Sequence, residues 1–140
     1  MSNFNELLSD ALSEKQKTFK DLEDCGIISK RSHYQFKTYT PFLLTVINIA
    51  NFLEVSLDYL AGRTNINTFK KYSVKQNNFY NKLIHMLKIS SISQSKLAND
   101  IKIGRTNFTY WKNGSLPKLS TLIDLAEYFG CSIDDFLDLD

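Results

Sequence analysis

Residues 92–117 admit few folds, because two short apolar stripes of helical spacing lie on either side of a break at Gly104. The members of the two stripes are Leu97, Ala98 and Ile101, followed by Phe108 and Trp111. Ser93 is suited to cap the first helix, since its hydroxyl can accept a backbone N–H of the first turn. Gly114 is suited to end the second helix in a left-handed conformation. The pattern therefore predicts two short helices joined by a tight turn.

The second of these helices has two unlike faces. If Phe108 and Trp111 point into the protein, the other side chains point outward. They are Arg105, Thr106, Asn107, Tyr110 and Lys112. This outer face carries basic, amide and hydroxyl groups and no acid, which is what a helix entering a DNA major groove needs.

A longer stretch around this motif resembles a known family, the lambda-repressor/Cro-type regulators of the xenobiotic-response-element family. The stretch reads SQSKLANDIKIGRTNFTYWKNGSLPKLSTLIDLAEYFGCSIDDFL. The matching features are Gln94 opening a helix, the Leu97-Ala98 pair, Ile103, Phe108, Trp111, Asn113-Gly114, Pro117 and the closing LIDLAEYFGCSIDDFL. One departure is Lys102, in a turn where glycine is more usual, and a positive φ there costs a non-glycine residue about 1 kcal/mol. The resemblance implies a five-helix domain that binds double-stranded DNA.

Specific roles follow for the second half of the chain. We expect base contacts from Arg105, Thr106, Asn107 and Tyr110, with Arg105 reaching a guanine edge through two hydrogen bonds. We expect phosphate contacts, which fix register, from Gln94, Lys112, Asn113 and Lys118.

The first half of the chain repeats the second. Residues 18–22 align with 93–97 at an offset of 75, and residues 41–60 align with 117–136 at an offset of 76, with seven identical positions in the latter pair. Such self-similarity indicates a duplicated unit. The sequence therefore predicts an all-α protein of two tandem five-helix lambda-repressor-like helix-turn-helix domains. The expected division is a degenerate domain over 1–62, a basic polar linker over 63–77 and a DNA-binding domain over 78–140.

The first repeat departs further from the family pattern. Phe19 stands where the second repeat has Gln94, and Gly26 comes one position early for the turn glycine, which leaves the register of the next helix open by one residue. Residues 29–37 still predict a recognition helix. Its expected base contacts are Lys30, Arg31, Ser32 and Gln35. The alternative is a degenerate copy retained for dimerisation, and the linker is either a solvated spacer or a basic strap along DNA.

Other functional classes find little support in the sequence. The two histidines, His33 and His85, are isolated, and no nucleotide-binding, protease or metal-binding motif occurs, so we expect no enzyme, no metal and no cofactor. The uninterrupted apolar run needed to span a membrane is lacking. Cys25 and Cys131 have no metal-site spacing and are expected to be reduced and buried, in the cytoplasm of a bacterial or phage-infected cell.

The function predicted is a sequence-specific DNA-binding transcriptional regulator, a repressor of phage or mobile-element type. The alternative is a protein-binding inhibitor or antitoxin-like module on a helix-turn-helix scaffold, favoured by a charge near zero in each repeat. Residues 1–66 hold seven basic and eight acidic side chains, and 79–140 hold seven of each. Partners left open are a homodimer mate and another protein. The expected dimer surface consists of Phe69, Tyr72, Phe79 and Tyr80.

Overall fold

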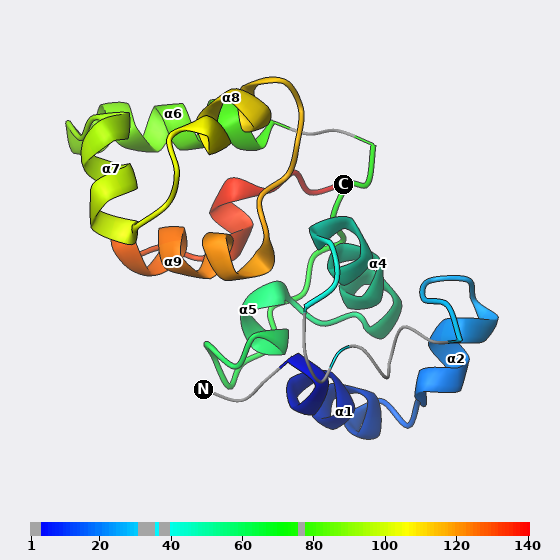
Figure 1. Cartoon of the computed structure of the whole chain (residues 1–140). Coiled ribbons are helices and arrows are strands. Elements are labelled where there is room, and N and C mark those ends of the chain that lie inside the picture. The colour runs from blue at the N-terminus through cyan, green and yellow to red at the C-terminus, as the bar shows by residue number, and fades with distance from the viewer. Residues whose placement is uncertain (1–3, 31–35, 37–39, 76–77) are drawn as a thin grey trace. The chain divides into compact units, whose positions relative to one another are not determined.

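The computed structural model describes residues 4–30, 36, 40–75 and 78–140. Over these residues the chain is all-helical, with eight α-helices and one 3-10 helix, and it forms two compact units (Figure 1). Unit 1 comprises Met1–Lys71 and unit 2 comprises Tyr72–Asp140. No helix in the described part of the chain is long and apolar enough to cross a bilayer.

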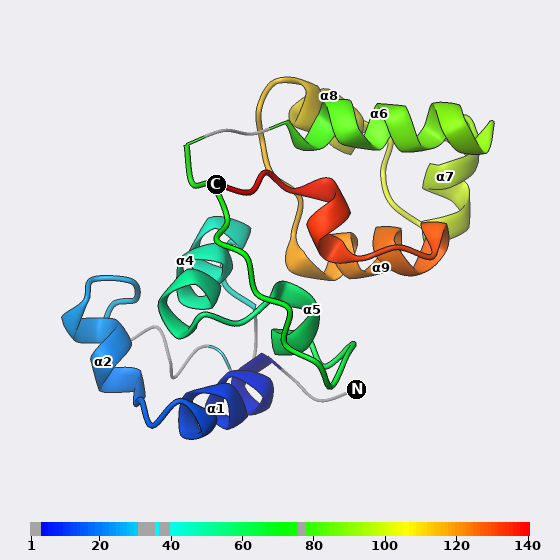
Figure 2. The ribbon, with the colours of Figure 1, turned by 180° about the vertical axis from the view of Figure 1, so that it is seen from behind.

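Unit 1 contains four of the helices. They are α1 (Phe4–Glu14), α2 (Phe19–Asp24), α4 (Leu43–Leu53) and α5 (Leu57–Leu60). Helix α5 packs on both α1 and α4 (Figure 2). The core between the helices is apolar apart from the buried Ser56, and its members without exposed surface include Leu8, Leu22, Val46, Ile49 and Leu57. Helix α4 supplies the largest share because six of its eleven residues are buried.

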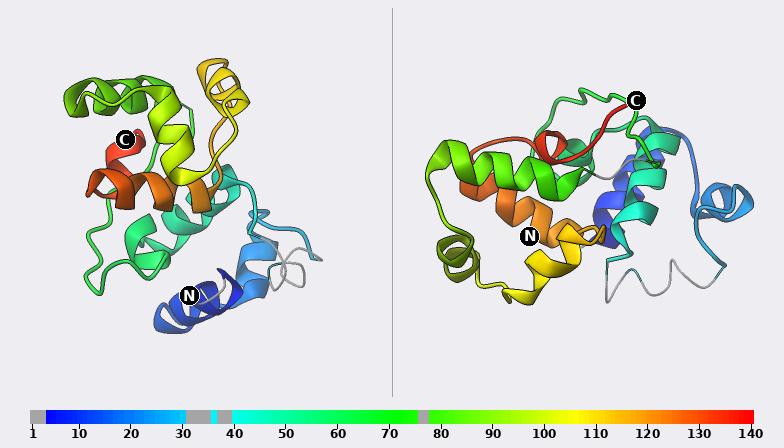
Figure 3. Two further views of the ribbon diagram at one scale, coloured as in Figure 1. Left: turned by 60° about the vertical axis from the view of Figure 1, so that its left-hand side comes forward. Right: turned by 90° about the horizontal axis from the view of Figure 1, so that it is seen from above.

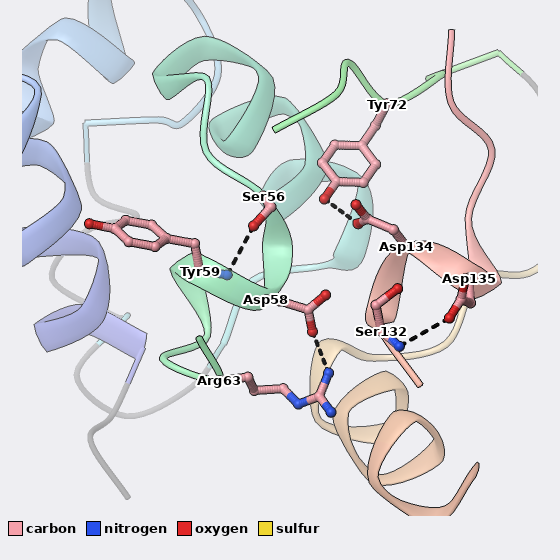
Figure 4. Close-up of polar contacts among 8 residues, drawn as sticks. All are labelled: Ser56, Asp58, Tyr59, Arg63, Tyr72, Ser132, Asp134 and Asp135. Atoms are coloured by element: carbon pink, nitrogen blue, oxygen red, sulfur yellow. Dashed lines mark hydrogen bonds and ion pairs between the residues drawn. The ribbon is translucent and has the colours of Figure 1, made fainter. Parts of the chain in front are cut away.

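The segment after α5 folds back on unit 1. Ser56 caps α5 by accepting the N–H of Tyr59 at 3.1 Å, and Asp58 in the first turn pairs with Arg63 (Figure 4). Asn67 then bridges two backbone groups, accepting the N–H of Ser56 at 2.9 Å and donating to the carbonyl of Glu54 at 2.9 Å. The first part of the expected linker is thus bonded to α5 and its cap.

Unit 2 contains the remaining elements. They are α6 (Phe79–Ser90), α7 (Gln94–Ile101), α8 (Thr106–Lys112), α9 (Leu119–Phe129) and the 3-10 helix η1 (Ile133–Phe136). Helix α6 packs on α8 and on η1, and α7 packs on α9 (Figure 3). The first helix of the unit therefore contacts its last helical element. An aromatic cluster joins these elements, with the Phe79 ring 5.3 Å from Trp111 and 6.1 Å from Phe136 between centroids.

The two ends of unit 2 are tied together. Tyr72 is 1% exposed, pairs with Leu139 in an isolated antiparallel bridge, and donates its hydroxyl to Asp134 (Figure 4). The carboxylate of Asp138 accepts the backbone N–H of Asn78 at 2.8 Å and its side-chain amide at 3.2 Å. We call residues 72–75, Asn78 and residues 134–139 the terminal clasp.

The clasp corrects the expected dimer surface. Tyr72 and Phe79 are each 1% exposed and belong to the core of unit 2, so they are not free to form an interface. The physical reason is the pairing of residues about sixty positions apart, which the local sequence pattern does not reveal. The clasp also divides the expected linker, since residues 63–71 lie in unit 1 and Tyr72 begins unit 2. The proposed domain bounds themselves stay a prediction.

The two thiols also differ from expectation. Cys25 and Cys131 are not joined in a disulfide, but Cys25 is exposed and Cys131 is partly exposed. Cys25 is the C-cap of α2 and follows the last helical turn, so its side chain leaves the buried face of the helix. The expectation that both cysteines are buried was wrong.

Because of Asp138, we expect the stability of unit 2 to depend on pH. Partial burial opposes its ionisation, but hydrogen bonds from Asn78 and the nearby Lys82 ammonium outweigh that effect and lower the pKa of Asp138 below its ordinary value. Because the folded-state pKa is depressed, the stabilisation is present above about pH 4, the unfolded value, and is lost as pH falls through the folded pKa.

We expect the free energy of unfolding of unit 2 to fall on acidification and Asp138→Asn to reduce that dependence. Urea unfolding followed by fluorescence of Trp111, the only tryptophan in the chain, measures this at each pH. Asp124 provides the contrast, because burial and the nearby Glu127 raise the pKa of its carboxyl group, so Asp124→Asn should not reduce the loss of stability on acidification. Identical pH profiles for wild type and Asp138→Asn would contradict the prediction.

Candidate nucleic-acid interface

The joint between α7 and α8 is held by backbone geometry. Ser93 caps α7 by accepting the N–H of Lys96 at 3.0 Å, as predicted. Lys102 follows α7 in the left-handed conformation, with φ 58° and ψ 51°, and the next N–H, of Ile103, donates to the carbonyl of Ala98 at 3.0 Å. The turn therefore keeps a left-handed residue although a lysine occupies it. Ala98 is 4% exposed, so the small side chain lies at a buried position of α7.

The inner side of α8 is aromatic. Phe108 and Trp111 are each 5% exposed, and their rings meet edge to face at 5.2 Å. Trp111 also meets the Phe79 ring of α6 edge to face, at 90° between planes. This packing fixes the rotation of α8 about its axis. The prediction that both aromatic residues point into the protein is confirmed.

The outer side of α8 is open to solvent. Arg105, Thr106 and Lys112 are exposed, and Tyr110 is 61% exposed despite its aromatic ring. Asn107 lies differently. It is half-buried, and its side-chain amide donates to the carbonyl of Gly104 at 2.9 Å, so that its N–H group stabilises the turn before α8.

Thr109 also belongs to the outer face, although the sequence did not lead us to predict it there. Thr109 is exposed and lies three positions after Thr106 and four after Arg105, a spacing that places all three on neighbouring positions of one helical side. That spacing was a sufficient signal. Thr109 adds a hydroxyl and a methyl group between Arg105 and Lys112.

The residues of the expected phosphate contacts lie at helix ends. Gln94 is the first residue of α7, and its side-chain amide donates to the hydroxyl of Tyr80 at 3.3 Å. Lys112 ends α8 and Asn113 caps it. Lys118 is the N-cap of α9. It makes no side-chain capping bond, because its ammonium group cannot accept a hydrogen bond from the N–H groups of the first turn. All four side chains are exposed.

The charge of α7 is balanced on the side that contacts α9. Asp100 accepts the hydroxyl of Tyr128 at 2.5 Å and pairs with Lys96 at 3.1 Å. The hydrogen bond from Tyr128 and then the interaction with Lys96 lower the pKa of Asp100, so it is ionised at neutral pH. This acid is tied to α9, whereas α8 itself has no acidic residue.

Unit 1 repeats the turn with a shorter helix. Thr18 and Asp21 form a capping box at the start of α2, and the N–H of Ile27 donates to the carbonyl of Leu22 at 3.0 Å after a left-handed Gly26 with φ 77°. Gly26 thus takes the place of Lys102, and α2 ends early. The next helix, whose register the sequence left open by one residue, lies mostly outside the described residues.

The expected recognition helix of unit 1, over residues 29–37, is described only at Ser29, Lys30 and Phe36. Lys30 is exposed. Arg31, Ser32 and Gln35 lie outside the described residues, as does most of the expected helix over 29–37. Phe36 is 2% exposed and meets the Phe4 ring at 5.6 Å, so its predicted inward position is confirmed.

The described residues contain no cluster of three or more His, Cys, Asp or Glu side chains able to hold a metal ion. Comparison with curated proteins and with solved structures found no match. Comparison with protein families found one match. Residues 82–140 match the model of the Cro/C1-type HTH DNA-binding domain, a region that includes α7, the turn and α8. The match places a DNA-binding domain of this type in unit 2 and supports a DNA-binding regulator.

Proposed function

We propose that the protein is a sequence-specific regulator of transcription that reads the major groove of double-stranded DNA with α8. One observation carries this proposal: Phe108 and Trp111 are buried while Arg105, Thr106 and Tyr110 are exposed on the opposite side of the same short helix. The match of residues 82–140 to a DNA-binding domain supports it.

In the proposed mechanism each group on this face has a distinct task. Arg105 donates two hydrogen bonds to a guanine edge, and Thr106, Thr109 and Tyr110 contact neighbouring bases or the groove wall. Asn107 contributes through its side-chain oxygen and its second amide N–H, because the other N–H bonds the carbonyl of Gly104. The cations of Lys112 and Lys118 neutralise phosphates and set the register.

We further propose that the two units are tandem copies of one domain. Corresponding elements begin at nearly constant offsets, 75 residues for α1 and α6 and for α2 and α7, and 76 for α4 and α9 and for α5 and η1. Left-handed residues recur at the same offsets, as Gln16 with Ser91 and Glu54 with Gly130. On this basis the first unit also faces DNA with Lys30, Arg31, Ser32 and Gln35.

The biological role proposed is that of a repressor of phage or mobile-element type, acting as a homodimer without catalysis, in the cytoplasm of a bacterial or phage-infected cell. A regulator of this kind blocks a promoter by occupying it. The exposed basic side chains around α8 are few, so we expect a modest dependence of affinity on salt.

Selection of bound duplexes from a random pool tests the proposal. We expect wild type to enrich one sequence, and Arg105→Ala to lose about 5- to 150-fold in affinity for it, since one bidentate contact discriminates by about 1–3 kcal/mol. The mutant should relax preference at a single base pair. Lys88→Ala is the matched control, because Lys88 is an exposed cation on α6 of the same unit, away from α8 in sequence.

A second function follows if wild type enriches no sequence and Arg105→Ala behaves like it. The protein would then be a protein-binding inhibitor or antitoxin-like module. The observation that favours this alternative is the exposure of a large apolar residue, Phe42, which is 89% exposed in unit 1. Co-purification of a host partner with the intact chain would then identify the target.

A further inference from the structure

The carbonyl group of Gly104 accepts two N–H groups from a single residue, Asn107. The backbone N–H of Asn107 donates to this carbonyl at 3.2 Å, and the side-chain amide of the same residue donates to it at 2.9 Å. A carbonyl oxygen has two lone pairs, so Asn107 engages both of them. Asn107 is half-buried, whereas its neighbours on the outer side of α8, Arg105, Thr106 and Thr109, are exposed.

This arrangement fixes the peptide group that leads into Arg105. Gly104 has no side chain to limit its backbone, and glycine has more backbone freedom than any other residue. Arg105 is the N-cap of α8 and makes no side-chain capping bond, so its own side chain does not hold its place. The carbonyl of Arg105 accepts the N–H of the buried Phe108 at 3.2 Å. The backbone of Arg105 is therefore held from both sides, by Asn107 through the preceding peptide and by Phe108 through the following one.

We infer that Asn107 is a positioning residue for Arg105, beyond its proposed base contact. The inference rests on the proposed function, in which Arg105 forms two hydrogen bonds with one guanine. Both donor–acceptor distances must then lie within about 2.7–3.2 Å at the same time. The long side chain of Arg105 has many rotamers of its own, so added motion of its backbone makes the paired geometry rarer. Asn107 thus contributes to specificity at the base pair that Arg105 reads and not only at its own.

Selection of duplexes from a random pool by the full chain tests the inference at single base pairs. The base pair that Arg105 reads is the one at which Arg105→Ala loses its preference. We expect Asn107→Ala to reduce the preference at that same base pair by about 2- to 10-fold, the range for one hydrogen bond. A residue that only contacted its own base would leave that preference unchanged. In the Arg105→Ala background, Asn107→Ala should cost less affinity than in wild type, because the two residues act together.

Two further variants separate positioning from other effects. Thr109→Ala is the matched control, because Thr109 is exposed on the same helix and should affect only its own base contact. Asn107→Asp keeps the shape of the side chain and its acceptor oxygens but has no N–H to donate. An acid in the first turn favours a helix, so this variant should keep α8 folded. Its added charge weakens binding to all duplexes alike, so the preference at the base pair of Arg105 should still fall.

A measurement without DNA separates this inference from the proposed function. In the free protein the backbone amide of Arg105 should have an NMR order parameter of about 0.85, typical of rigid backbone, and Asn107→Ala should lower it toward about 0.6. Thr109→Ala should leave it unchanged. An unchanged order parameter in Asn107→Ala, or an unchanged preference at the base pair of Arg105, would overturn the inference. If wild type enriches no sequence, the proposed function fails, and the order parameter alone then decides whether Asn107 holds Arg105.

Discussion

Replacement of Trp111 by alanine is expected to unfold most of unit 2 and to abolish DNA binding with it. Trp111 is 5% exposed and holds α8 against α6 through Phe79, while a second edge contact joins it to Phe108. Removing a buried aromatic residue of this size costs about 3–5 kcal/mol. A core of roughly seventy residues rarely supplies more than about 3–5 kcal/mol of stability. The loss therefore approaches the whole stability of the unit.

Because the mutation removes the fluorescent probe, dispersion of amide and methyl signals in NMR spectra is the better measurement. We expect the signals of unit 2 to collapse toward unfolded positions. Tyr110→Ala is the matched control on the next residue of α8, since Tyr110 is 61% exposed. It should change stability by no more than about 0.5 kcal/mol while weakening DNA binding. A folded unit 2 in Trp111→Ala would show that α8 is held by something other than this aromatic contact.

The second large effect is expected at Tyr72. This side chain is 1% exposed and donates a hydrogen bond to Asp134, which anchors the terminal clasp. Tyr72→Ala should lower the free energy of unfolding of unit 2 by about 3 kcal/mol or more, as for other buried aromatic residues. Tyr72→Phe keeps the ring and loses only the hydrogen bond to a carboxylate, which is worth about 1.5–3 kcal/mol.

Urea unfolding monitored by Trp111 fluorescence reports on unit 2, because the single tryptophan of the chain lies there. Comparing the two variants separates the effect of losing the ring from the effect of losing the hydrogen bond. Val74→Ala is the control within the same segment, since Val74 is 49% exposed and should have little effect. If Tyr72→Ala left the fluorescence transition unmoved, residues 72–78 would be a spacer and not a part of the folded unit.

The local sequence was sufficient to predict α7, α8 and the buried and exposed faces of α8. The aromatic spacing of Phe108 and Trp111 predicted which side is buried, because that spacing is a property of one helix and needs no distant partner. The cap at Ser93 and the positive φ of Gly114 were predicted for the same reason, since each acts within a few residues. The outer face of α8 followed from these elements.

Tertiary structure alone decided which apolar residues outside the helical stripes are buried and how the polar groups are paired. Tyr72 and Phe79 looked like surface residues, but contacts with Asp134 and Trp111 bury them. Asp138 bonds Asn78 from sixty residues away. The spacing of apolar residues predicts which side of its own helix a side chain lies on. These pairings depend instead on which helices and segments pack against each other. The sequence by itself therefore determined α7, α8 and the exposed face of α8, because these depend on neighbouring residues, and the packing of the chain determined the clasp that closes unit 2.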